Sequence, residues 1–593
     1  MLRARSLISE RRFLWIAVAI GMLLGAATLR VGFFGDDFAF ITWLDSAEGK
    51  RTFDLYEFAS GRPAETYELV RRGPFPWWTA PDLKVRFLRP LSSALLACDH
   101  ALFGSHPLGY HLHSLLWYLG LLVAVGLLLR QTLTAPTWGL ALLMYALSES
   151  HGEPVGWISS RHALIAATPA LFGLVAQLSY REGAFRPGRW LAPLGVVIGL
   201  LGSESAVGPA LYWIAYEAVG RRPEVRWIER ARGVSVPGGL VLAYLAIYKL
   251  LGYGAANNSA YIEPLADPLR FARVVAMRVP ALLAEQFTEL PSGMAVAFPE
   301  AHPPWIGGIA TCAVALVLRS VWSAIAPSDR RALAWLSLGA FGSLCASVGG
   351  LPGSRLLLTP GIGGYALVAA SVVYGSSRAS AAFAGGLWAR RAYAALMLTL
   401  HLVLAPVLFL AGVDFLGQVG AKTIEIGASL DPILGGAGST PAAPKHVYIL
   451  SSSDPLGAFY AGSARQMRAP GTAATWCSMS MARATHRIER LDPHTLLISA
   501  DRPLFGGFFD QVFRSTDAAF AVGDTFDLDD LRVTVRSTES EHPTAIALSF
   551  HEPIDDPKFL LLAWREGKLT QVVLPAEGDR LVIPWSAGPT GFF

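Results

Sequence analysis

The sequence predicts a polytopic α-helical membrane protein of about eleven spans, followed by a C-terminal, mostly β domain with a sandwich-like arrangement outside the membrane. Two overall features support this fold class. The mean hydropathy of the 593-residue chain is +0.41, and only 16% of its residues are charged, a combination that soluble domains do not show. In addition, the hydrophobic pattern changes after Phe415. Long apolar runs give way to short runs in which apolar and polar residues alternate.

Apolar runs recur along the first 414 residues, which we interpret as the membrane domain. A spanning helix needs roughly 20 apolar residues, and runs of about this length lie at 13–29, 110–129, 234–251, 305–321 and 392–413. Shorter or glycine-broken runs lie at 138–147, 162–180, 190–219, 332–348 and 356–374. The run 190–219 is expected to cross twice, as two short helices that meet at Ser203-Glu204-Ser205.

Orientation follows from the arginines, because short basic loops stay cytoplasmic. Arg11 and Arg12 precede the first span, and Arg130, Arg181 and Arg330 fall on the same predicted side. We therefore expect a cytoplasmic N-terminus, outer loops at 32–108 and 252–304, and an extracytoplasmic C-terminal domain, in a bacterial inner (plasma) membrane. A cleaved signal peptide is the alternative interpretation of the first apolar run.

The C-terminal region is predicted to consist of a linker at 415–440 and a soluble domain at 441–593. Alternating runs indicate strands at 446–450, 495–499, 531–535, 545–550 and 559–564. The four cysteines are scattered and indicate no disulfide framework. The formal net charge of +4 comes from basic residues at span ends, so no nucleic-acid partner is expected.

Unusual polar residues gather on the predicted outer side. Asp36 and Asp37 come directly after the first span, where an ionised group near hydrocarbon is costly and commonly functional. A helix N-cap with a solvated loop is the alternative. His151 and Glu153 follow the third span, and His111 lies near the outer end of the second, but their spacing matches no specific zinc pattern. No cofactor is predicted firmly, and a divalent metal remains an alternative.

Four further residues are candidates for ligand binding. Glu204 lies between two short helices, too deep for a solvated loop. Arg355, Arg161 and Arg89 lie at the outer mouth, and each offers a planar fork of donors that suits phosphate. Pairing with an arginine is the structural alternative for Glu204, and contact with lipid headgroups is the alternative for the three arginines.

In this order, these residues resemble the GT-C superfamily of integral-membrane glycosyltransferases, especially its protein O-mannosyltransferase-like branch, over roughly residues 10–375. The matching segments are Asp36-Asp37, Arg89-Pro90-Leu91 with His111, Glu153 to Arg161, Ser203-Glu204-Ser205 and Ser354-Arg355 to Gly364. There are two departures: Ser203 stands where the family usually has lysine, and the C-terminal region lacks the tetratricopeptide repeats of related transmembrane proteins.

The resemblance implies a polyprenyl-phosphate sugar as donor, membrane lipids as neighbours and an unknown extracytoplasmic acceptor. It assigns Asp36 or Asp37 as general base in an inverting transfer. Arg355, Arg161 and Arg89 would bind the donor phosphate, with Glu153, Glu204, His111 and His151 in support.

Two other classes of function remain open at this stage. A lipid or polysaccharide transporter or flippase also uses intramembrane carboxylates and arginines. An inactive envelope-assembly scaffold or sensor would act through the C-terminal domain. That domain shows no catalytic pattern, and Asp454, His494, Asp510 and His551 are expected to lie at its surface.

Overall fold

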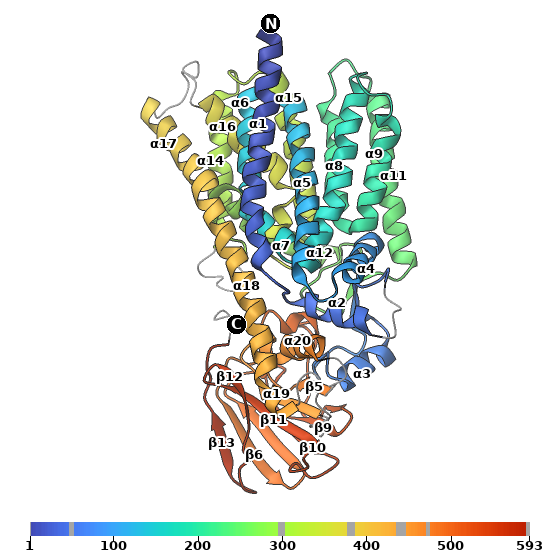
Figure 1. Cartoon of the computed structure of the whole chain (residues 1–593), viewed down its shortest axis with the longest axis vertical. Coiled ribbons are helices and arrows are strands. Elements are labelled where there is room, and N and C mark those ends of the chain that lie inside the picture. The colour runs from blue at the N-terminus through green and yellow to red at the C-terminus, as the bar shows by residue number, and fades with distance from the viewer. Residues whose placement is uncertain are drawn as a thin grey trace.

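The chain folds into a bundle of long helices with a β domain attached to one end (Figure 1). The computed structural model describes residues 2–46, 52–293, 303–375, 386–434, 446–469 and 475–588, without the side chains of residues 2–9 and 387. Helix α1 (Leu2–Gly25) begins at the end of the bundle that is distant from the β domain (Figure 1). This arrangement agrees with the predicted fold class.

Thirteen described helices make up most of the bundle. After α1 they are α5 (Pro107–Thr132), α6 (Ala135–Ala146), α8 (His162–Arg181), α9 (Gly188–Gly202), α10 (Val207–Ala215), α11 (Trp227–Leu250), α12 (Pro268–Thr288), α14 (Trp305–Val321), α15 (Pro327–Ser347), α16 (Gly361–Gly375), α17 (Gly386–Thr399) and α18 (Ala405–Ser429). Among the described residues, five segments are long and apolar enough to cross a membrane, namely 10–30, 107–132, 158–181, 227–250 and 388–429. Helix α9 ends and α10 begins on either side of Ser203-Glu204-Ser205, so the predicted break is confirmed.

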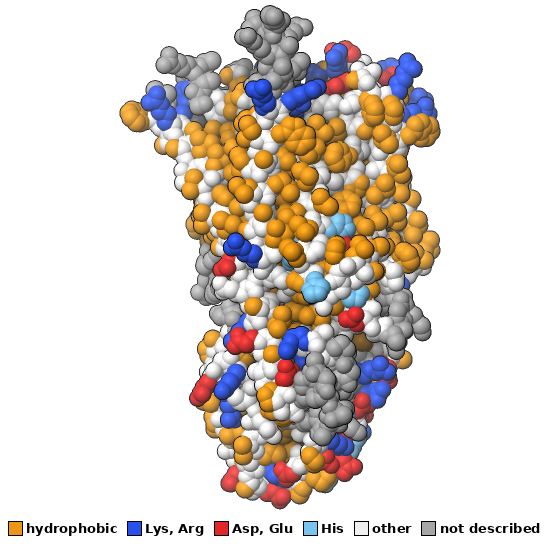
Figure 2. All heavy atoms as spheres, viewed as in Figure 1, with side chains coloured by type: hydrophobic (Ala, Val, Ile, Leu, Met, Phe, Trp, Pro, Cys, Tyr) orange, Lys and Arg blue, Asp and Glu red, His pale blue; other side chains and the backbone are white. Residues whose placement is uncertain are grey.

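The surface of the bundle carries a broad apolar band. Figure 2 shows hydrophobic side chains over most of this band, with Lys and Arg side chains collected at the rim distant from the β domain. Charged side chains of both signs are scattered over the β domain in the same view. A helix surface that is apolar between charged borders is typical of contact with lipid. The span count and the orientation of the termini stay predictions.

The β domain contains two sheets. The larger has the strand order β13-β6-β7-β10-β9-β8 and the smaller has the order β12-β11-β4-β5. The five predicted strands are confirmed as β4 (His446–Ser451), β7 (Thr495–Ala500), β9 (Leu531–Glu539), β10 (His542–Phe550) and β11 (Phe559–Arg565). The strands that were missed are β5 (Thr475–Ser478), β6 (His486–Asp492), β8 (Thr525–Asp527), β12 (Lys568–Gln571) and β13 (Arg580–Ile583). Most of these are short or carry charges.

The predicted linker at 415–440 is wrong over much of its length. Helix α18 continues through Ser429, and α19 (Asp431–Leu434) follows it directly. Two glycines of α18 are close-contact positions: a Cβ at Gly420 would lie 2.3 Å from the Phe33 carbonyl oxygen, and one at Gly427 would lie 2.8 Å from that of Ala461. The helix therefore packs closely against the segments that contain Phe33 and Ala461. Residues 435–440 lie outside the described ranges.

The predicted first outer loop, residues 32–108, shares one hydrophobic core with the β domain. The loop contains α2 (Asp36–Asp45), β1 (Glu57–Ser60), α3 (Pro63–Arg71), β2 (Lys84–Arg86) and α4 (Pro90–Phe103). Its Trp78 ring stacks on Phe505 of the β domain, with centroids 4.9 Å apart and an interplanar angle of 9°. Trp77 Nε1 donates to the Met479 carbonyl oxygen at 3.0 Å. The C-terminal domain therefore packs directly against this loop.

Candidate functional site

The candidate site lies where the helix bundle meets the β domain. Helix α2 begins at Asp36, after Gly35 with a φ of +55°. At this backbone angle a residue with a Cβ is strained, so glycine fits the sharp entry into the helix. Three further predicted residues come from other segments: Arg89 directly precedes α4, Glu204 begins the short helix η4 (Glu204–Ala206), and Arg355 lies in the short helix η7 (Ser354–Leu357).

The two neighbouring aspartates have different surroundings. Asp37 is buried, and its carboxylate accepts hydrogen bonds from the Ser159 backbone N–H at 2.7 Å, the Ser159 hydroxyl and the Phe34 N–H at 3.1 Å. Burial raises the pKa of Asp37 to about 7, against these hydrogen bonds. Asp36 is only partly buried, and its Oδ1 accepts a hydrogen bond from the Tyr460 hydroxyl at 3.0 Å. Asp37 thus holds α2 in place, while Asp36 faces the site.

Arg355 forms an ion pair with Glu153 at the edge of the site. Its Nη1 contacts Glu153 Oε2, its Nη2 donates to the Leu351 carbonyl oxygen at 3.3 Å, and its guanidinium lies 5.5 Å from the ring centroid of Trp157. The Arg355 side chain is 18% exposed and that of Glu153 is 33% exposed. Arg355 also acts electrostatically on Asp36. A cation and a carboxylate therefore face the same partly exposed region.

Arg89 forms a two-point ion pair with Glu204. Arg89 Nε lies 3.0 Å from Glu204 Oε2, and Nη2 contacts Oε1. The guanidinium rests on the rings of Tyr56 and Phe87, with centroids 4.7 and 4.5 Å away. The pairing partner of Glu204 is thus Arg89, so the structural alternative for Glu204, pairing with an arginine, is confirmed.

Two residues that the sequence interpretation missed lie among these charges. Tyr261 interacts electrostatically with Asp36, Arg355, Arg89 and Glu204. Its backbone is fixed where the neighbouring Ile262 N–H donates to the Gly349 carbonyl oxygen at 2.9 Å.

The second missed residue is His162, which interacts electrostatically with Arg89 and Arg355. Its Nδ1 lies 3.2 Å from the Ser203 hydroxyl, and its ring contacts that of Tyr56 edge to face at 5.6 Å. His162 follows Arg161 directly, so its position next to a predicted binding residue was the available signal in the sequence.

A tyrosine of the β domain completes the site. Tyr460 ends the π-helical segment η9 (Leu456–Tyr460), which continues into α20 (Ala461–Arg468). The Oδ1 atom of Asp454 accepts hydrogen bonds from the N–H groups of Leu456 at 2.9 Å and Gly457 at 3.3 Å. Asp454 is 1% exposed, so the expectation that it lies at the surface is wrong.

Asp510 is buried as well and accepts hydrogen bonds from the N–H groups of Gly506 and Gly507, both at 2.9 Å. Its predicted surface position is therefore also wrong. The reason is the same for both aspartates: backbone N–H groups in irregular segments need acceptors, and a buried carboxylate supplies them.

Arg161, His111 and His151 lie in the interior. Arg161 is 1% exposed, contacts Asp99 Oδ2 and donates to the Tyr110 carbonyl oxygen at 3.1 Å. His111 Nε2 lies 2.8 Å from the Gly32 carbonyl oxygen. His151 Nδ1 lies 3.2 Å from the Tyr118 hydroxyl. These side chains bind other parts of the chain, and for Arg161 the geometry favours a structural ion pair.

Metal binding finds no support in the geometry. Within the described ranges, no group of three or more His, Cys, Asp or Glu side chains is arranged to hold a metal ion. The described carboxylates of the site are instead paired with cations or hydrogen-bond donors.

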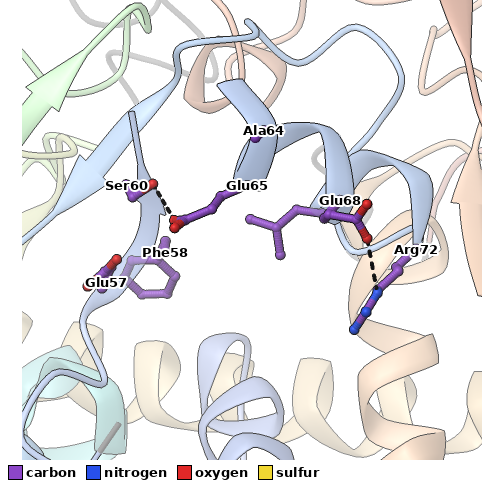
Figure 3. Close-up of a pocket in the computed structure, with 8 residues that line it drawn as sticks. Glu57, Phe58, Ser60, Ala64, Glu65, Glu68 and Arg72 are labelled. Atoms are coloured by element: carbon purple, nitrogen blue, oxygen red, sulfur yellow. Dashed lines mark hydrogen bonds and ion pairs between the residues drawn. The ribbon is translucent and has the colours of Figure 1, made fainter. Parts of the chain in front are cut away.

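A half-open groove of 450 Å³ lies between β1 and α3 in the outer loop (Figure 3). Three glutamates line it, Glu57, Glu65 and Glu68, together with Arg72 and the ring of Phe58. Figure 3 shows Glu65 turned toward Ser60 and Glu68 toward Arg72. Phe58 also packs on Phe40 and Trp43 of α2, with centroids 5.7 and 6.0 Å away, so the groove adjoins the helix that carries Asp36.

Comparison with known proteins gives similarity only at the level of solved structures. No protein-family model matches the chain, and no curated protein matches it. The oligosaccharyltransferase of Archaeoglobus fulgidus, solved with a tethered acceptor peptide, gives a TM-score of 0.38 at 13% identity. The match covers 78% of this chain and 64% of that chain, so this chain spans less than two thirds of its length.

Two other structures give similar values. AglB of A. fulgidus, in complex with an inhibitory peptide and a dolichol-phosphate, gives a TM-score of 0.37 at 14% identity over 78% of this chain and 65% of that chain. ArnT from Cupriavidus metallidurans, bound to undecaprenyl phosphate, gives 0.36 at 16% identity over 77% of this chain and 88% of that chain. At these identities the similarities assign neither a donor nor an acceptor to this chain.

Proposed function

We propose that this protein is a GT-C-type membrane glycosyltransferase that transfers a sugar from a polyprenyl-phosphate carrier to an extracytoplasmic acceptor. One observation carries the proposal. A partly exposed carboxylate, Asp36, and a partly exposed arginine, Arg355, interact electrostatically at the end of an apolar helix bundle. A lipid-linked donor presents its sugar and phosphate at the same boundary between hydrocarbon and water.

In the proposed reaction Asp36 is the general base. It takes the proton of an acceptor hydroxyl while the hydroxyl oxygen forms a bond to the anomeric carbon. The bond between that carbon and the phosphate oxygen breaks on the opposite face, which gives inversion. The polyprenyl phosphate leaves with the bonding electron pair, and its added negative charge requires nearby cations.

Arg355 is the proposed phosphate ligand, and Arg89 is the second candidate. Both are held by carboxylates, Glu153 and Glu204, whose side chains are 33% and 36% exposed. A phosphate that approaches such a pair can replace or extend the carboxylate contact without leaving a charge buried. Arg161 is already paired in the interior, so we propose that it positions the segment around Ser159.

Native mass spectrometry of the purified protein in lipid nanodiscs tests the donor site, with undecaprenyl phosphate as the probe. The wild type should bind the probe, and Arg355→Ala should weaken binding at least tenfold. Arg319→Ala is the matched control, because Arg319 is an exposed arginine in the last turn of α14. Equal binding by all three proteins would contradict the phosphate role of Arg355.

Mass spectrometry of glycolipids, glycoproteins and envelope polysaccharide tests the reaction itself in cells with and without the protein. A sugar present on an acceptor only when the protein is present supports transfer. A glycolipid that changes its side of the membrane while its covalent structure stays the same would instead support a transporter.

A further inference from the structure

The β domain contributes a side chain directly to the candidate site. The segment that carries Tyr460 packs against α2 and α18. Trp476 Nε1 donates to the Ala458 carbonyl oxygen at 2.9 Å, and Asp454 accepts from the first N–H groups of the segment. Phe509 contacts the Tyr460 ring edge to face at 6.0 Å. The position of the Tyr460 hydroxyl is therefore fixed by the fold of the β domain.

We propose that Tyr460 is a positioning residue for the general base, and that the β domain is for this reason an essential part of the active site. The inference rests on the proposed function. The Tyr460 hydroxyl donates to Asp36 Oδ1 at 3.0 Å. This contact fixes the rotation of the carboxylate and leaves the other oxygen, Oδ2, to accept a proton.

The same hydrogen bond tunes the basicity of Asp36. Burial raises the pKa of Asp36, whereas the Tyr460 hydroxyl and the Arg355 charge lower it. The charged or titratable groups that act on Asp36 are Tyr460, Arg355, Asp37, Tyr56 and Tyr261. Of these, Tyr460 is the described side chain with a hydrogen bond to Asp36. A donor to the ionised form keeps the base deprotonated at a lower pH.

The π-helical form of η9 fits this role. Single π-helical turns inside α-helices are rare and occur frequently at functional sites, because the wider turn moves side chains out of the regular register. Here η9 is the turn that ends with Tyr460 before the α-helical residues of α20 begin. The departure from α-helical geometry therefore coincides with the contact to Asp36.

The test uses Tyr460→Phe in the full-length protein, which removes the hydroxyl and keeps the ring. Its pKa effect is measured without catalysis, by infrared titration of the protonated carboxyl band of Asp36, identified by its loss in Asp36→Asn. The midpoint should rise by about one pH unit, the size of a hydrogen bond to a charged group. An unchanged midpoint would overturn the inference.

Sugar transfer gives the second readout. The acidic limb of the pH–rate profile should move up by the same amount in Tyr460→Phe. Tyr448→Phe is the matched control, because Tyr448 is a buried tyrosine of the same domain that packs on Phe550 and Phe559. The control should keep the wild-type limb, and a shift equal to that of Tyr460→Phe would indicate a general effect of the domain and overturn the inference.

The two readouts separate the inference from the proposed function. If wild-type protein transfers no sugar while the infrared midpoint still moves, the proposed reaction fails and the contact between Tyr460 and Asp36 stands. If Asp36→Asn abolishes transfer while Tyr460→Phe changes neither the midpoint nor the limb, the reaction stands and the positioning role is wrong.

Discussion

Ion pairs in the interior and at the edge of the site use the same residue types in different surroundings. In the interior, the side chains of Arg161 and Asp99 are 2% and 4% exposed, and His113 Nδ1 also contacts Asp99 at 2.7 Å. At the edge, Arg355 and Glu153 are 18% and 33% exposed. If a fully enclosed ion pair separates, a charge stays buried without a partner. If a partly exposed ion pair separates, water can hydrate the released charge. The exposed fraction of the side chain therefore distinguishes Arg355, the candidate phosphate ligand, from Arg161, although both are arginines in ion pairs.

Arg161→Ala should give the largest loss of stability. The change removes the arginine partner of the enclosed Asp99 and leaves His113 as its remaining contact. Breaking a buried pair costs about 3 to 5 kcal/mol. We expect a strongly lowered Tm in detergent, or loss of folded protein from the membrane. Arg161→Ala with Asp99→Asn should recover part of the Tm. A Tm equal to that of the wild type in the single variant would show that the interior pair contributes little.

Arg355→Ala should give a large loss of transfer with little change in Tm. Removing one preorganised charge-stabilising group commonly costs about 10² to 10³ in rate, and the partner Glu153 can be hydrated where it lies. Transfer rates and Tm measured on the same preparation check this. If Arg355→Ala lowers both the transfer rate and the Tm strongly, Arg355 has a structural role like that of Arg161.

Glu153→Gln should act in the opposite direction on binding. It releases Arg355 from its carboxylate partner, so undecaprenyl phosphate should bind more tightly, by a few-fold. A titration by native mass spectrometry measures the change. Weaker binding in this variant would mean that Glu153 holds Arg355 in the geometry that binds phosphate.

The buried Asp37 should make the stability of the protein depend on pH. Burial raises the pKa of Asp37 to about 7, so its protonated form is favoured in the folded state. Its contribution to stability is therefore complete below its ordinary pKa of 3.8 and is lost as the pH rises through about 7. The wild-type Tm should fall between about pH 4 and pH 8, and Asp37→Asn should show a smaller fall.

Asp510 should also lower the Tm as the pH rises, because burial raises its pKa to about 7 as well. Asp510→Asn is therefore the reference variant in the β domain, and each aspartate variant is compared with wild type. If Asp37→Asn keeps the full wild-type fall in Tm, Asp37 does not titrate in this range.

Much of the fold follows from periodicity, whereas the junction between bundle and β domain does not. Strands β4 and β10 have the alternating or apolar patterns that predict them, and the break at Ser203-Glu204-Ser205 follows from charge balance. The contact between Asp36 and Tyr460 joins residues 424 positions apart. Local patterns carry no information on such a contact, because tertiary packing determines it.

The site was predicted in part for the same reason. A positive-inside argument places arginines by membrane side, but it does not tell an exposed arginine from an enclosed one. Asp99, the partner of Arg161, lies in the middle of α4 between Cys98 and His100, where nothing in the sequence marks it as a partner. Tyr261 was missed because a single tyrosine in a long loop has no distinguishing pattern.

The central claim is that Asp36, and not its neighbour Asp37, is the general base. Transfer of sugar by Asp36→Asn and Asp37→Asn, with membrane levels matched to the wild type, tests it most directly. Asp36→Asn should lower the rate by roughly 10² to 10⁴ and keep binding of undecaprenyl phosphate. Folded Asp37→Asn should retain most of its activity. Near-normal transfer by Asp36→Asn would contradict the account.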